Sequence, residues 1–551
     1  MKIVIVGGVA GGASAAARIR RLDEFAEILL FERGEEVSYA NCGLPYVIGG
    51  VITEEEELFL QTPDSFWTRF RVQVRVHSEV TEIDRKKKRV RVRNLATGQD
   101  YEETYDKLVL SPGAEAFLPP VEGIGLPGVL TLRSVADLRR IRRMLKEKKG
   151  SRVLVVGGGF IGLEAAENLK LAGMDVTVLE GASQIFPPFD EEMAGILKKE
   201  MNENGIPVIL DAPVKRIKEG ESDYEVVYGS GQEIRCDWIL MAAGVRPESR
   251  LAREAGLEGN GRGGIVVDSY LRTSDKEIYA VGDAIEVKNQ ITGQASMLPL
   301  AGPANRQGRI AGANAAGAEP EEFSGVIGTS VAKIFGLTAA CTGLNERTLK
   351  KEGIPYQKVY LSPLSHAGYY PGGEPVTMKL LFSPAGRVLG CQCAGREGVD
   401  KRIDVIAAII KKEGTVSDLA NLELCYAPPY SSAKDPVNYA GFLAENVISG
   451  RSPIRHWEEL REETEESRIL LDVRTREEYE EGHLGGSIHI PLDELRERIQ
   501  EIPEEKEIWI YCQVGLRGYL AQRILMQRRK QKVFNISGGY RLLQVTGREE
   551  V

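Results

Sequence analysis

The sequence predicts an α/β protein with several domains, and three observations lead to this fold class. Its 551 residues exceed what one hydrophobic core supports, so roughly three or four domains are expected. The apolar run 2–6 is strand-like, and a glycine-rich turn, a helical segment and a second strand at 27–32 follow it. The same order recurs between 152–156 and 175–180. Strand, helix and strand in this order form the βαβ unit of a parallel sheet.

The second repeat carries a complete dinucleotide-binding fingerprint. Gly157, Gly159 and Gly162 form G-x-G-x-x-G between a strand and a helix. Small residues there let the backbone approach a pyrophosphate, which binds at the positive N-terminus of the helix. Glu180 ends the next strand, where a carboxylate accepts a hydrogen bond from an adenosine ribose. Because 181–184 contain no arginine or lysine for a 2′-phosphate, the sequence favours NADH over NADPH and predicts a Rossmann-like domain.

The first repeat is a less regular version of the same motif. Its turn, G-G-V-A-G-G, contains four glycines: Gly7, Gly8, Gly11 and Gly12. Val9 occupies the middle glycine position of the fingerprint, which weakens the match. Glu32 lies 20 residues beyond Gly12 and restores the ribose-binding carboxylate. The sequence therefore predicts a duplicated Rossmann architecture with two nucleotide sites.

The order of these motifs, followed by T-S-D-K-E-I-Y-A-V-G-D-A at 273–284, resembles the pyridine nucleotide–disulfide oxidoreductases over about residues 1–445. In that family the aspartate after Y-A-V-G meets the ribityl chain of FAD, which implies this role for Asp283 beside Gly282. The resemblance implies FAD on the first unit and NADH on the second. The further FAD contacts that it implies are Arg33, Val80 and Ala301.

The most informative residue is Cys42, in S-Y-A-N-C-G-L-P at 38–45. The next cysteine along the chain is Cys236, so a redox bond between two closely spaced cysteines is excluded. A lone cysteine beside a flavin must form its redox bond with a small thiol or with an oxygen atom. The motif resembles the single-cysteine branch of the family, and in particular the coenzyme A-disulfide reductases. That match continues through three further segments, 365–372, 395–404 and 426–431.

The resemblance assigns tyrosines and basic residues around Cys42. It implies that Tyr369 and Tyr426 come from the second subunit of a homodimer to meet Cys42 and the departing thiol, with Tyr370 as the alternative to Tyr369. The contacts that it implies for coenzyme A are Arg18 and Arg21 at the nucleotide end, and Ser38 and Asn41 near the pantetheine or the cysteine. Spacing by three residues lets Arg18 and Arg21 share one side of a helix.

The implied reaction passes electrons from NADH through FAD to sulfur at Cys42. The Cys42 thiolate attacks the S–S bond of coenzyme A disulfide, coenzyme A persulfide or polysulfide. The sequence leaves open which of these is the physiological substrate.

The last 95 residues or so form a separate unit with its own cysteine. Cys512 lies in I-Y-C-Q-V-G-L-R-G, directly after a strand and before a helix. Residues 512–517 and the upstream run 470–491, with Asp472, Arg474 and His483, resemble a rhodanese domain. A loop of converging N–H groups at a helix N-terminus stabilises a persulfide anion on such a cysteine. The resemblance implies substrate contact by Arg517, whereas Gln513 departs from the arginine often found second in the loop.

Two other functions remain open. The first is an NADH oxidase or peroxidase that cycles Cys42 through sulfenic acid; such peroxidases carry a histidine where this chain has Ala10. The second is a non-enzymatic scaffold that senses redox state and carries sulfur on Cys512. Turnover with NADH separates the scaffold from the enzymes, and the oxidant consumed separates the enzymes from each other.

Amino-acid composition limits the classes of binding partner and the cellular compartment that are expected. A net charge of −9 argues against nucleic acid as the main partner. No run of about 18 apolar residues is present, so no membrane span is expected. Seven cysteines without disulfide-framework spacing fit a reducing cytosol, so a cytoplasmic protein is expected. The remaining cysteines, Cys341, Cys391, Cys393 and Cys425, lack metal-ligand spacing, and no metal is expected.

The predicted domain boundaries follow the motifs. They are 1–115 and 245–324 for the two parts of the FAD-binding domain, 116–244 for the NADH-binding domain, 325–446 for an α+β dimerisation domain, 447–456 for a linker and 457–551 for the rhodanese domain.

Overall fold

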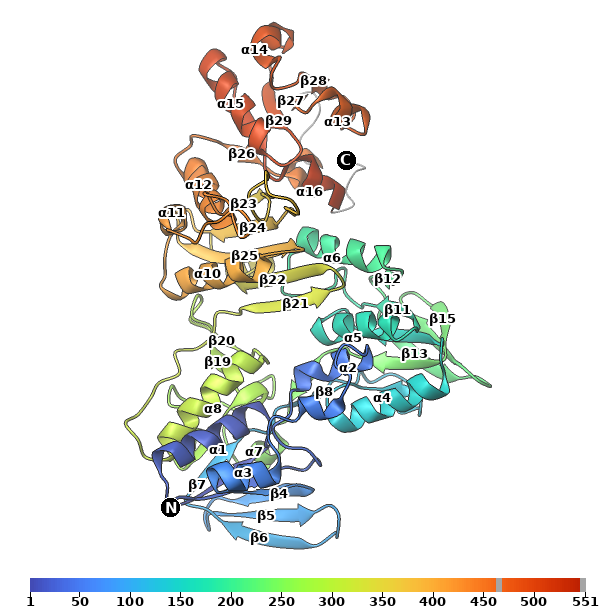
Figure 1. The fold of residues 1–551 in the computed structure, drawn as a ribbon, viewed down its shortest axis with the longest axis vertical. Helices are drawn as coiled ribbons and strands as arrows, with labels where there is room; N and C mark the ends of the chain where they lie inside the picture. The colour runs from blue at the N-terminus through green and yellow to red at the C-terminus, as the bar shows by residue number, and fades with distance from the viewer. Residues whose placement is uncertain (462–467, 546–551) are drawn as a thin grey trace. The chain divides into compact units, whose positions relative to one another are not determined.

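The computed structural model describes residues 1–461 and 468–545, which form two compact units (Figure 1). The first unit comprises 1–183 and 205–326, and the second comprises 184–204 and the chain from 327 onward. The predicted class, two Rossmann-like domains with an α+β domain and a C-terminal α/β domain, is confirmed. Residues 462–467 and 546–551 of the predicted C-terminal domain lie outside the described residues. Within the described chain, no helix is both long and apolar enough to cross a bilayer.

The first nucleotide unit is built on a parallel five-stranded sheet with the order β18-β7-β1-β2-β3. Its strands are β1 (Lys2–Val6), β2 (Glu27–Phe31), β3 (Val72–Arg75), β7 (Lys107–Leu110) and β18 (Ile278–Ala280). Helix α1 (Ala10–Leu22) packs on α8 (Ala301–Ala315), which returns from much later in the chain. An antiparallel sheet of β4 (Ser78–Asp84), β5 (Arg89–Asn94) and β6 (Asp100–Thr104) interrupts the order. Strand β18 and helix α8 thus complete the sheet and the helical layer begun by β1 and α1.

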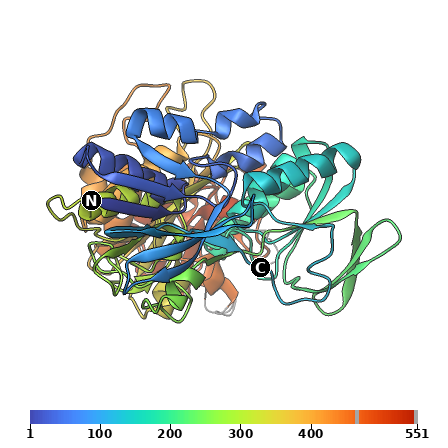
Figure 2. The same ribbon diagram turned by 90° about the horizontal axis from the view of Figure 1, so that it is seen from below.

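The second nucleotide unit repeats the design with the order β12-β11-β10-β16-β9. Its strands are β9 (Val129–Leu130), β10 (Arg152–Val156), β11 (Asp175–Leu179), β12 (Val208–Ile209) and β16 (Trp238–Met241), and its helices are α4 (Val135–Glu147) and α5 (Phe160–Leu171). The chain enters and leaves through the paired strands β8 (Ala114–Ala116) and β17 (Val245–Pro247). A three-stranded sheet of β13 (Val214–Glu219), β14 (Tyr224–Tyr228) and β15 (Gln232–Cys236) is appended (Figure 2).

Both Gly-rich turns depend on backbone contacts that leave no room for a side chain. A Cβ added to Gly12 would lie 1.8 Å from the carbonyl oxygen of Gly7, and one added to Gly162 would lie 1.9 Å from that of Gly157. The middle position is different, because a Cβ on Gly159 would meet nothing within 4 Å. The valine at that position of the first turn, Val9, has a negative φ of −96°, so the left-handed conformation that favours glycine is not required there. The irregular motif therefore keeps the two glycines that the geometry needs.

The second of the two compact units, made of 184–204 and the chain from 327 onward, contains an antiparallel sheet with the order β21-β22-β25-β24-β23. Its strands are β21 (Ser330–Ile334), β22 (Leu337–Gly343), β23 (Gln357–Leu361), β24 (Thr377–Phe382) and β25 (Val388–Gly395). Its helices are α6 (Glu191–Glu203), α9 (Glu346–Lys351), α10 (Val399–Lys411), α11 (Val416–Asn421) and α12 (Pro436–Ile448). Strands β24 and β25 are buried along their whole length, and α6 and α10 both contact β25. Helix α6 is contributed by the segment that follows β11.

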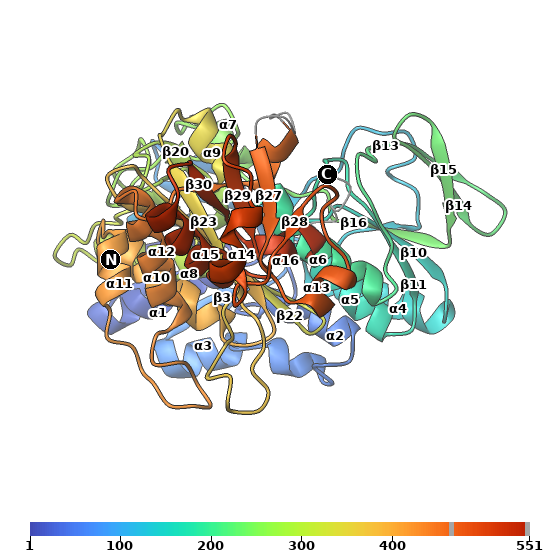
Figure 3. The same cartoon turned by 90° about the horizontal axis from the view of Figure 1, so that it is seen from above.

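The C-terminal domain belongs to the same unit and has a parallel sheet with the order β26-β30-β29-β27-β28 (Figure 3). Its strands are β26 (Ile454–Arg455), β27 (Arg468–Asp472), β28 (Ile488–His489), β29 (Glu507–Tyr511) and β30 (Val533–Ile536). Its helices are α13 (Arg476–Glu480), α14 (Leu495–Arg498), α15 (Leu516–Arg528) and α16 (Gly539–Val545). Five residues separate the end of α12 from β26.

A buried ammonium group organises the second unit. Lys379 on β24 has a fully buried side chain, and its Nζ lies 2.8 Å from Asp190. It also pairs with Glu192 and Glu346. Burial alone would raise the pKa of Glu346, but the ammonium groups of Lys379 and Lys358 outweigh it and hold the pKa well below its usual value. The N-cap residue of α6, a residue within α6 and the first residue of α9 are thereby tied to β24.

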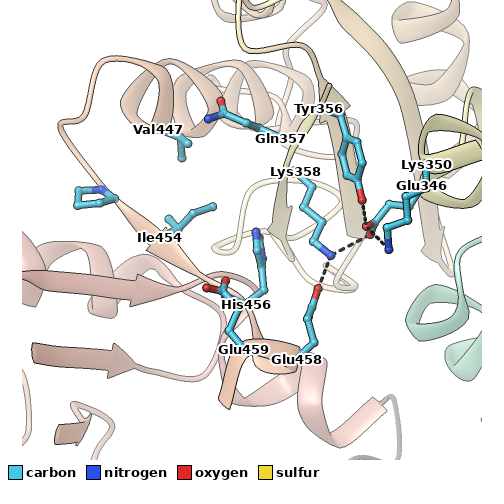
Figure 4. Close-up of a pocket in the computed structure, with 11 residues that line it drawn as sticks. Glu346, Lys350, Tyr356, Gln357, Lys358, Val447, Ile454, His456, Glu458 and Glu459 are labelled. Atoms are coloured by element: carbon cyan, nitrogen blue, oxygen red, sulfur yellow. Dashed lines mark hydrogen bonds and ion pairs between the residues drawn. The ribbon is translucent and has the colours of Figure 1, made fainter. Parts of the chain in front are cut away.

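The same network reaches the C-terminal domain. Lys358 on β23 pairs with Glu346 at 2.9 Å and with Glu458, which lies in the 3₁₀ turn Trp457–Arg461 (Figure 4). The backbone N–H of Tyr360 donates to Oγ of Ser537 at 3.0 Å, in the loop after β30. The C-terminal domain therefore packs against strand β23.

Replacing Lys379 by methionine is expected to lower the free energy of unfolding by about 3–5 kcal/mol, because Asp190, Glu192 and Glu346 all lose an ion-pair partner in the interior. Of these three, and among the described residues, only Glu346 retains another buried partner, Lys358. Lys350→Met is the matched control, since Lys350 contacts Glu346 at 3.6 Å with its side chain 69 % exposed. That substitution should change stability by no more than about 0.5 kcal/mol. Thermal unfolding of the two variants checks the prediction, and equal losses would contradict it.

The pH dependence of the same variants has a definite sign. The folded-state pKa of Glu346 is depressed from the ordinary value of 4.5, so the ion pairs contribute fully above that pH and lose their contribution as the pH falls. Without Lys379 the carboxylates are instead relieved by protonation. The stability difference between wild type and Lys379→Met should therefore shrink below about pH 4.5, which thermal unfolding across pH measures.

Candidate active sites

Each glycine-rich turn is paired with the carboxylate that the sequence assigns to a ribose. The N–H of Gly8 donates to Glu32 at 2.9 Å, and the N–H of Gly158 donates to Glu180 at 2.6 Å. The second oxygen of each carboxylate accepts a backbone N–H just beyond the strand, from Gly34 and Ala182. The two turns thus combine a helix N-terminus, a glycine backbone without side chains and a positioned carboxylate, and this donor set fits a dinucleotide.

The returning segment brings Asp283 to the carboxyl ends of β1 and β7. It lies in the 3₁₀ turn Gly282–Ala284 directly after β18, and its carboxylate pairs with Arg133 at 2.8 Å. Gly282 has a φ of +81°, and its N–H donates to the buried side chain of Gln307. Asp283 therefore lies at the same end of the sheet as the first glycine turn.

The other predicted FAD contacts are more dispersed. Arg33 forms a bidentate ion pair with Glu248, at 2.7 Å for both bonds. Val80 is buried in β4, and Ala301 is the first residue of α8. The structure thus places Ala301 on the helix that packs against α1, while the guanidinium of Arg33 is already engaged.

Cys42 is exposed in the short 3₁₀ turn Asn41–Gly43, immediately before α2 (Leu44–Ile48). The segment is held to the first glycine turn by Ser38, whose N–H donates to the carbonyl of Gly8 at 2.8 Å. Ser38 is buried and adopts a φ of +51°, a strained conformation for serine. Asn41 directs its side-chain oxygen toward the thiol, 3.9 Å from Sγ.

Sequence reasoning missed a carboxyl group near this thiol. Partial enclosure by the protein and the charge of Glu164 raise the pKa of Cys42, while Arg133 works in the opposite direction. Burial, followed by the charge of Glu167, raises the pKa of Glu164 to about 7. Glu164 is on α5, which packs against α2, so its proximity to Cys42 is a tertiary effect without a sequence signal.

Arg18 and Arg21 on α1 have different neighbours. Arg18 pairs with Glu321 at 2.8 Å, and its Nε has no hydrogen-bond partner within the described chain. Arg21 lies over the ring of Phe70 at 5.8 Å. Only Arg18 thus combines a half-buried guanidinium with an unused donor.

The second unit brings Tyr369 and Tyr426 together. Their hydroxyl oxygens are 2.7 Å apart, and the side chains are respectively 76 % and 48 % exposed. Tyr370 instead packs edge-on against His366. All three side chains reach the surface, since Tyr370 is 43 % exposed, and the hydrogen bond joins Tyr369 to Tyr426.

A buried arginine links the loop that carries Tyr369 to the loop that carries Tyr426. Arg402, 1 % exposed, donates to the carbonyl of Ser365 at 2.6 Å and pairs with Asp435 at 3.0 Å. Asp435 also accepts a hydrogen bond from Ser431, beyond the second loop. One guanidinium thus links segments that are far apart in the sequence.

Cys512 occupies the turn between β29 and α15, as predicted, and its side chain is buried. The N–H of Gly515 donates to Sγ at 3.1 Å, so the backbone of the loop points at the sulfur. Tyr540 supports the loop by donating its N–H to the carbonyl of Cys512 at 2.8 Å. Such a loop at a helix N-terminus stabilises negative charge on sulfur.

The upstream motif residues surround this loop. Asp472 and Arg474 form a buried ion pair at 2.7 Å, and Arg517 pairs with Glu478 at 2.6 Å. His483 stacks on Tyr479 and lies outside this ion-pair set. Glu478 is a site residue that sequence reasoning missed, although its position four residues beyond Arg474 within the recognised motif was a signal.

Three family models match the chain. Pyridine nucleotide-disulphide oxidoreductase matches residues 1–319, its dimerisation domain matches 329–436, and the rhodanese-like domain matches 456–544. Among curated relatives, an NADH oxidase of Methanocaldococcus jannaschii is 38 % identical over 452 residues, 82 % of this chain and 100 % of the relative. A coenzyme A disulfide reductase of Staphylococcus aureus is 35 % identical over 447 residues, 81 % of this chain and all of the relative.

Two solved structures match nearly the whole chain. Reduced CoADR-RHD from Bacillus anthracis has a TM-score of 0.96 and 48 % identity, covering 99 % of this chain and 98 % of that one. A NAD-dependent persulfide reductase from A. fulgidus has a TM-score of 0.93 and 39 % identity, covering 98 % and 100 %. Sequence motifs, sheet order and site geometry agree with these matches, and the chain belongs to the pyridine nucleotide-disulphide oxidoreductase family, with that family's dimerisation domain and a C-terminal rhodanese-like domain.

Proposed function

We propose that this protein is a homodimeric, FAD-dependent reductase that uses NADH to cleave the S–S bond of coenzyme A disulfide, coenzyme A persulfide or polysulfide at Cys42. The observation that carries the proposal is a single exposed cysteine held beside the first nucleotide turn. In the proposal the rhodanese-like domain handles sulfane sulfur through Cys512. Seven unpaired cysteines suit a reducing, cytoplasmic location.

The relatives support sulfur over oxygen as the oxidant. The NADH oxidase of M. jannaschii matches 82 % of the chain, whereas the persulfide reductase and CoADR-RHD structures match nearly all of it. A rhodanese-like domain has a use in sulfur transfer and none in the reduction of oxygen. Ala10, at the first glycine turn, also offers no polar partner to a sulfenic acid on Cys42. The NADH oxidase function is the second candidate.

The residues present fit the two nucleotides that the proposal needs. In the proposal, Gly7, Gly12 and Glu32 hold one and Gly157, Gly162 and Glu180 hold the other. Asp283 meets the ribityl chain at the first site, and Gly8 and Gly11 line its turn. Bound FAD would supply the path by which two electrons from NADH reach the sulfur on Cys42. The protein contributes the binding, the orientation and the electrostatics.

The chemistry at Cys42 is a thiol–disulfide exchange followed by reduction. The Cys42 thiolate attacks one sulfur of the substrate, forms a new S–S bond, and releases the other sulfur as a thiolate. Two electrons then cleave the mixed disulfide or persulfide, releasing the second thiolate or sulfide and regenerating the Cys42 thiolate. Thus each S–S bond that is broken consumes one NADH.

The exposed tyrosine pair suits a role at the site of a second subunit. Two hydroxyls at 2.7 Å share one hydrogen bond, so the pair retains one free proton to donate. In the proposal, Tyr369 and Tyr426 of one subunit protonate or orient the leaving thiolate at Cys42 of the other. Arg18, Arg21, Ser38 and Asn41 are proposed to contact coenzyme A.

Cys42→Ser is expected to lower NADH oxidation with coenzyme A disulfide or persulfide by about a hundredfold or more, because the nucleophile is lost. Cys425→Ser, at the other exposed cysteine, is the matched control and should retain activity. Turnover is measured with coenzyme A disulfide, coenzyme A persulfide, polysulfide, oxygen and peroxide in turn. Full sulfur reduction by Cys42→Ser would refute the proposal, and turnover only with oxygen or peroxide would establish the second candidate.

Glu164→Gln is expected to lower the pH at which Cys42 ionises, because a charge that opposes the thiolate is removed. The effect should be largest above pH 7, near which Glu164 itself ionises. The pH dependence of Cys42 alkylation by iodoacetamide measures the shift. Glu147→Gln, an exposed residue on α4, removes the same charge elsewhere and should leave the curve in place. An unmoved curve for Glu164→Gln would show that the two groups are uncoupled.

A further inference from the structure

The cations around Cys512 are already neutralised. Arg517 donates to both carboxylate oxygens of Glu478, at 2.6 and 2.7 Å. Arg474, 2 % exposed, is held by the buried carboxylate of Asp472. Neither guanidinium therefore presents an uncompensated positive charge to a molecule that approaches the sulfur.

The cavity beside the cysteine loop is more acidic than basic. Its volume is about 200 Å³, and the residues that line it are Arg474, Glu478, Glu481, Gly482, Gln513, Tyr540 and Gln544. Its lining contains one guanidinium, that of Arg474, and two carboxylates, those of Glu478 and Glu481. The partners behind the lining, Asp472 and Arg517, add one charge of each sign. The amide of Gln513 bonds that of Gln544 at 3.3 Å, so the loop residue next to Cys512 offers a neutral amide. Such a lining repels anions and suits an uncharged, hydrogen-bonding chain.

We propose that Glu478 determines the donor specificity of Cys512: it neutralises Arg517 and thereby selects alkyl persulfides, whose reacting end is the neutral S–SH group, over donors such as thiosulfate, whose reacting end is a dianion. The inference rests on the proposed function only in taking Cys512 as a sulfur acceptor. The inference adds the class of sulfur donor that Cys512 accepts and names Glu478 as the residue that determines this class.

The two donors differ in the charge that the loop must accommodate. From an alkyl persulfide, R–S–SH, the Cys512 thiolate takes the outer SH group, which forms a new S–S bond, and the thiolate R–S⁻ leaves. From thiosulfate, the thiolate takes the outer sulfur and the sulfite dianion leaves. Neither transfer is a net oxidation or reduction. Only the second requires a dianion to bind and depart beside the loop.

The position of Glu478 allows the charge to be removed with little change in structure. Glu478 is the third residue of α13 and closes a capping box, accepting the N–H of Thr475 at 2.9 Å while its own N–H donates to the threonine hydroxyl. Glutamine also closes such a box. Glu478→Gln therefore keeps the cap and the side-chain volume and leaves the charge of Arg517 uncompensated.

The test measures sulfur loading of Cys512 in the full-length chain with Cys42→Ser as background, without NADH. Intact-protein mass spectrometry follows the gain of one sulfur atom from thiosulfate or from the persulfide of N-acetylcysteamine. Glu478→Gln should raise the ratio of the thiosulfate rate to the persulfide rate by about tenfold or more, the scale of one uncompensated charge acting on a dianion. Glu480→Gln, an exposed residue at the end of the same helix, removes an equal charge without contacting Arg517 and should leave the ratio within about twofold.

An unchanged ratio in Glu478→Gln, or a wild-type protein that loads from thiosulfate as fast as from the persulfide, would overturn the inference. Should Glu478→Gln load from neither donor, Gln513→Arg replaces it, since it adds a cation while the Arg517–Glu478 pair stays intact. An unchanged ratio in that variant would also overturn the inference. Because NADH takes no part in loading, failure of the proposed reductase function would leave this measurement interpretable.

Discussion

The backbone contact between each helix N-terminus and the turn before it is the constraint on which the nucleotide sites depend. The helix starts so close to the strand that only hydrogen fits at Gly12 and Gly162. This closeness aims the N–H groups of the first helical turn at the space beyond the sheet. The loop of Cys42 is then fastened to the first of these turns by Ser38. Cofactor binding and thiol placement thus share one origin.

The second unit relies on a different physical device, the compensated buried cation. Lys379, Arg402 and Arg474 are all nearly inaccessible, and each is surrounded by carboxylates or carbonyl oxygens. Two of them link segments distant in sequence: Lys379 ties α6 to a sheet, and Arg402 joins the loops that carry Tyr369 and Tyr426. Removing one partner of such a pair costs more than the intact pair contributes. These residues therefore set loop positions more sharply than apolar packing does.

The sequence predicts those parts of the site whose position follows from the succession of neighbouring secondary-structure elements. The glycine turns, Glu180 and the cysteine between β29 and α15 all follow from a strand, a turn and a helix in succession. Lys379 was unpredictable, because V-T-M-K-L-L-F gives no sign that its lysine is inside. The proximity of Glu164 to Cys42 depends on helices packing across the fold. The roles of Tyr369 and Tyr426 came from resemblance, and their hydrogen bond appears only in three dimensions.

The packing of the C-terminal domain against β23 has a consequence for any shortened form of the chain. Lys358 and the backbone N–H of Tyr360 find partners in Glu458 and Ser537, on the far side of the junction. Loss of the last hundred residues by a truncating mutation would leave a nearly buried lysine short of one carboxylate and a backbone donor without an acceptor. A shortened chain would therefore have to replace both contacts with water, so the dimerisation domain is expected to be less stable alone than in the full chain.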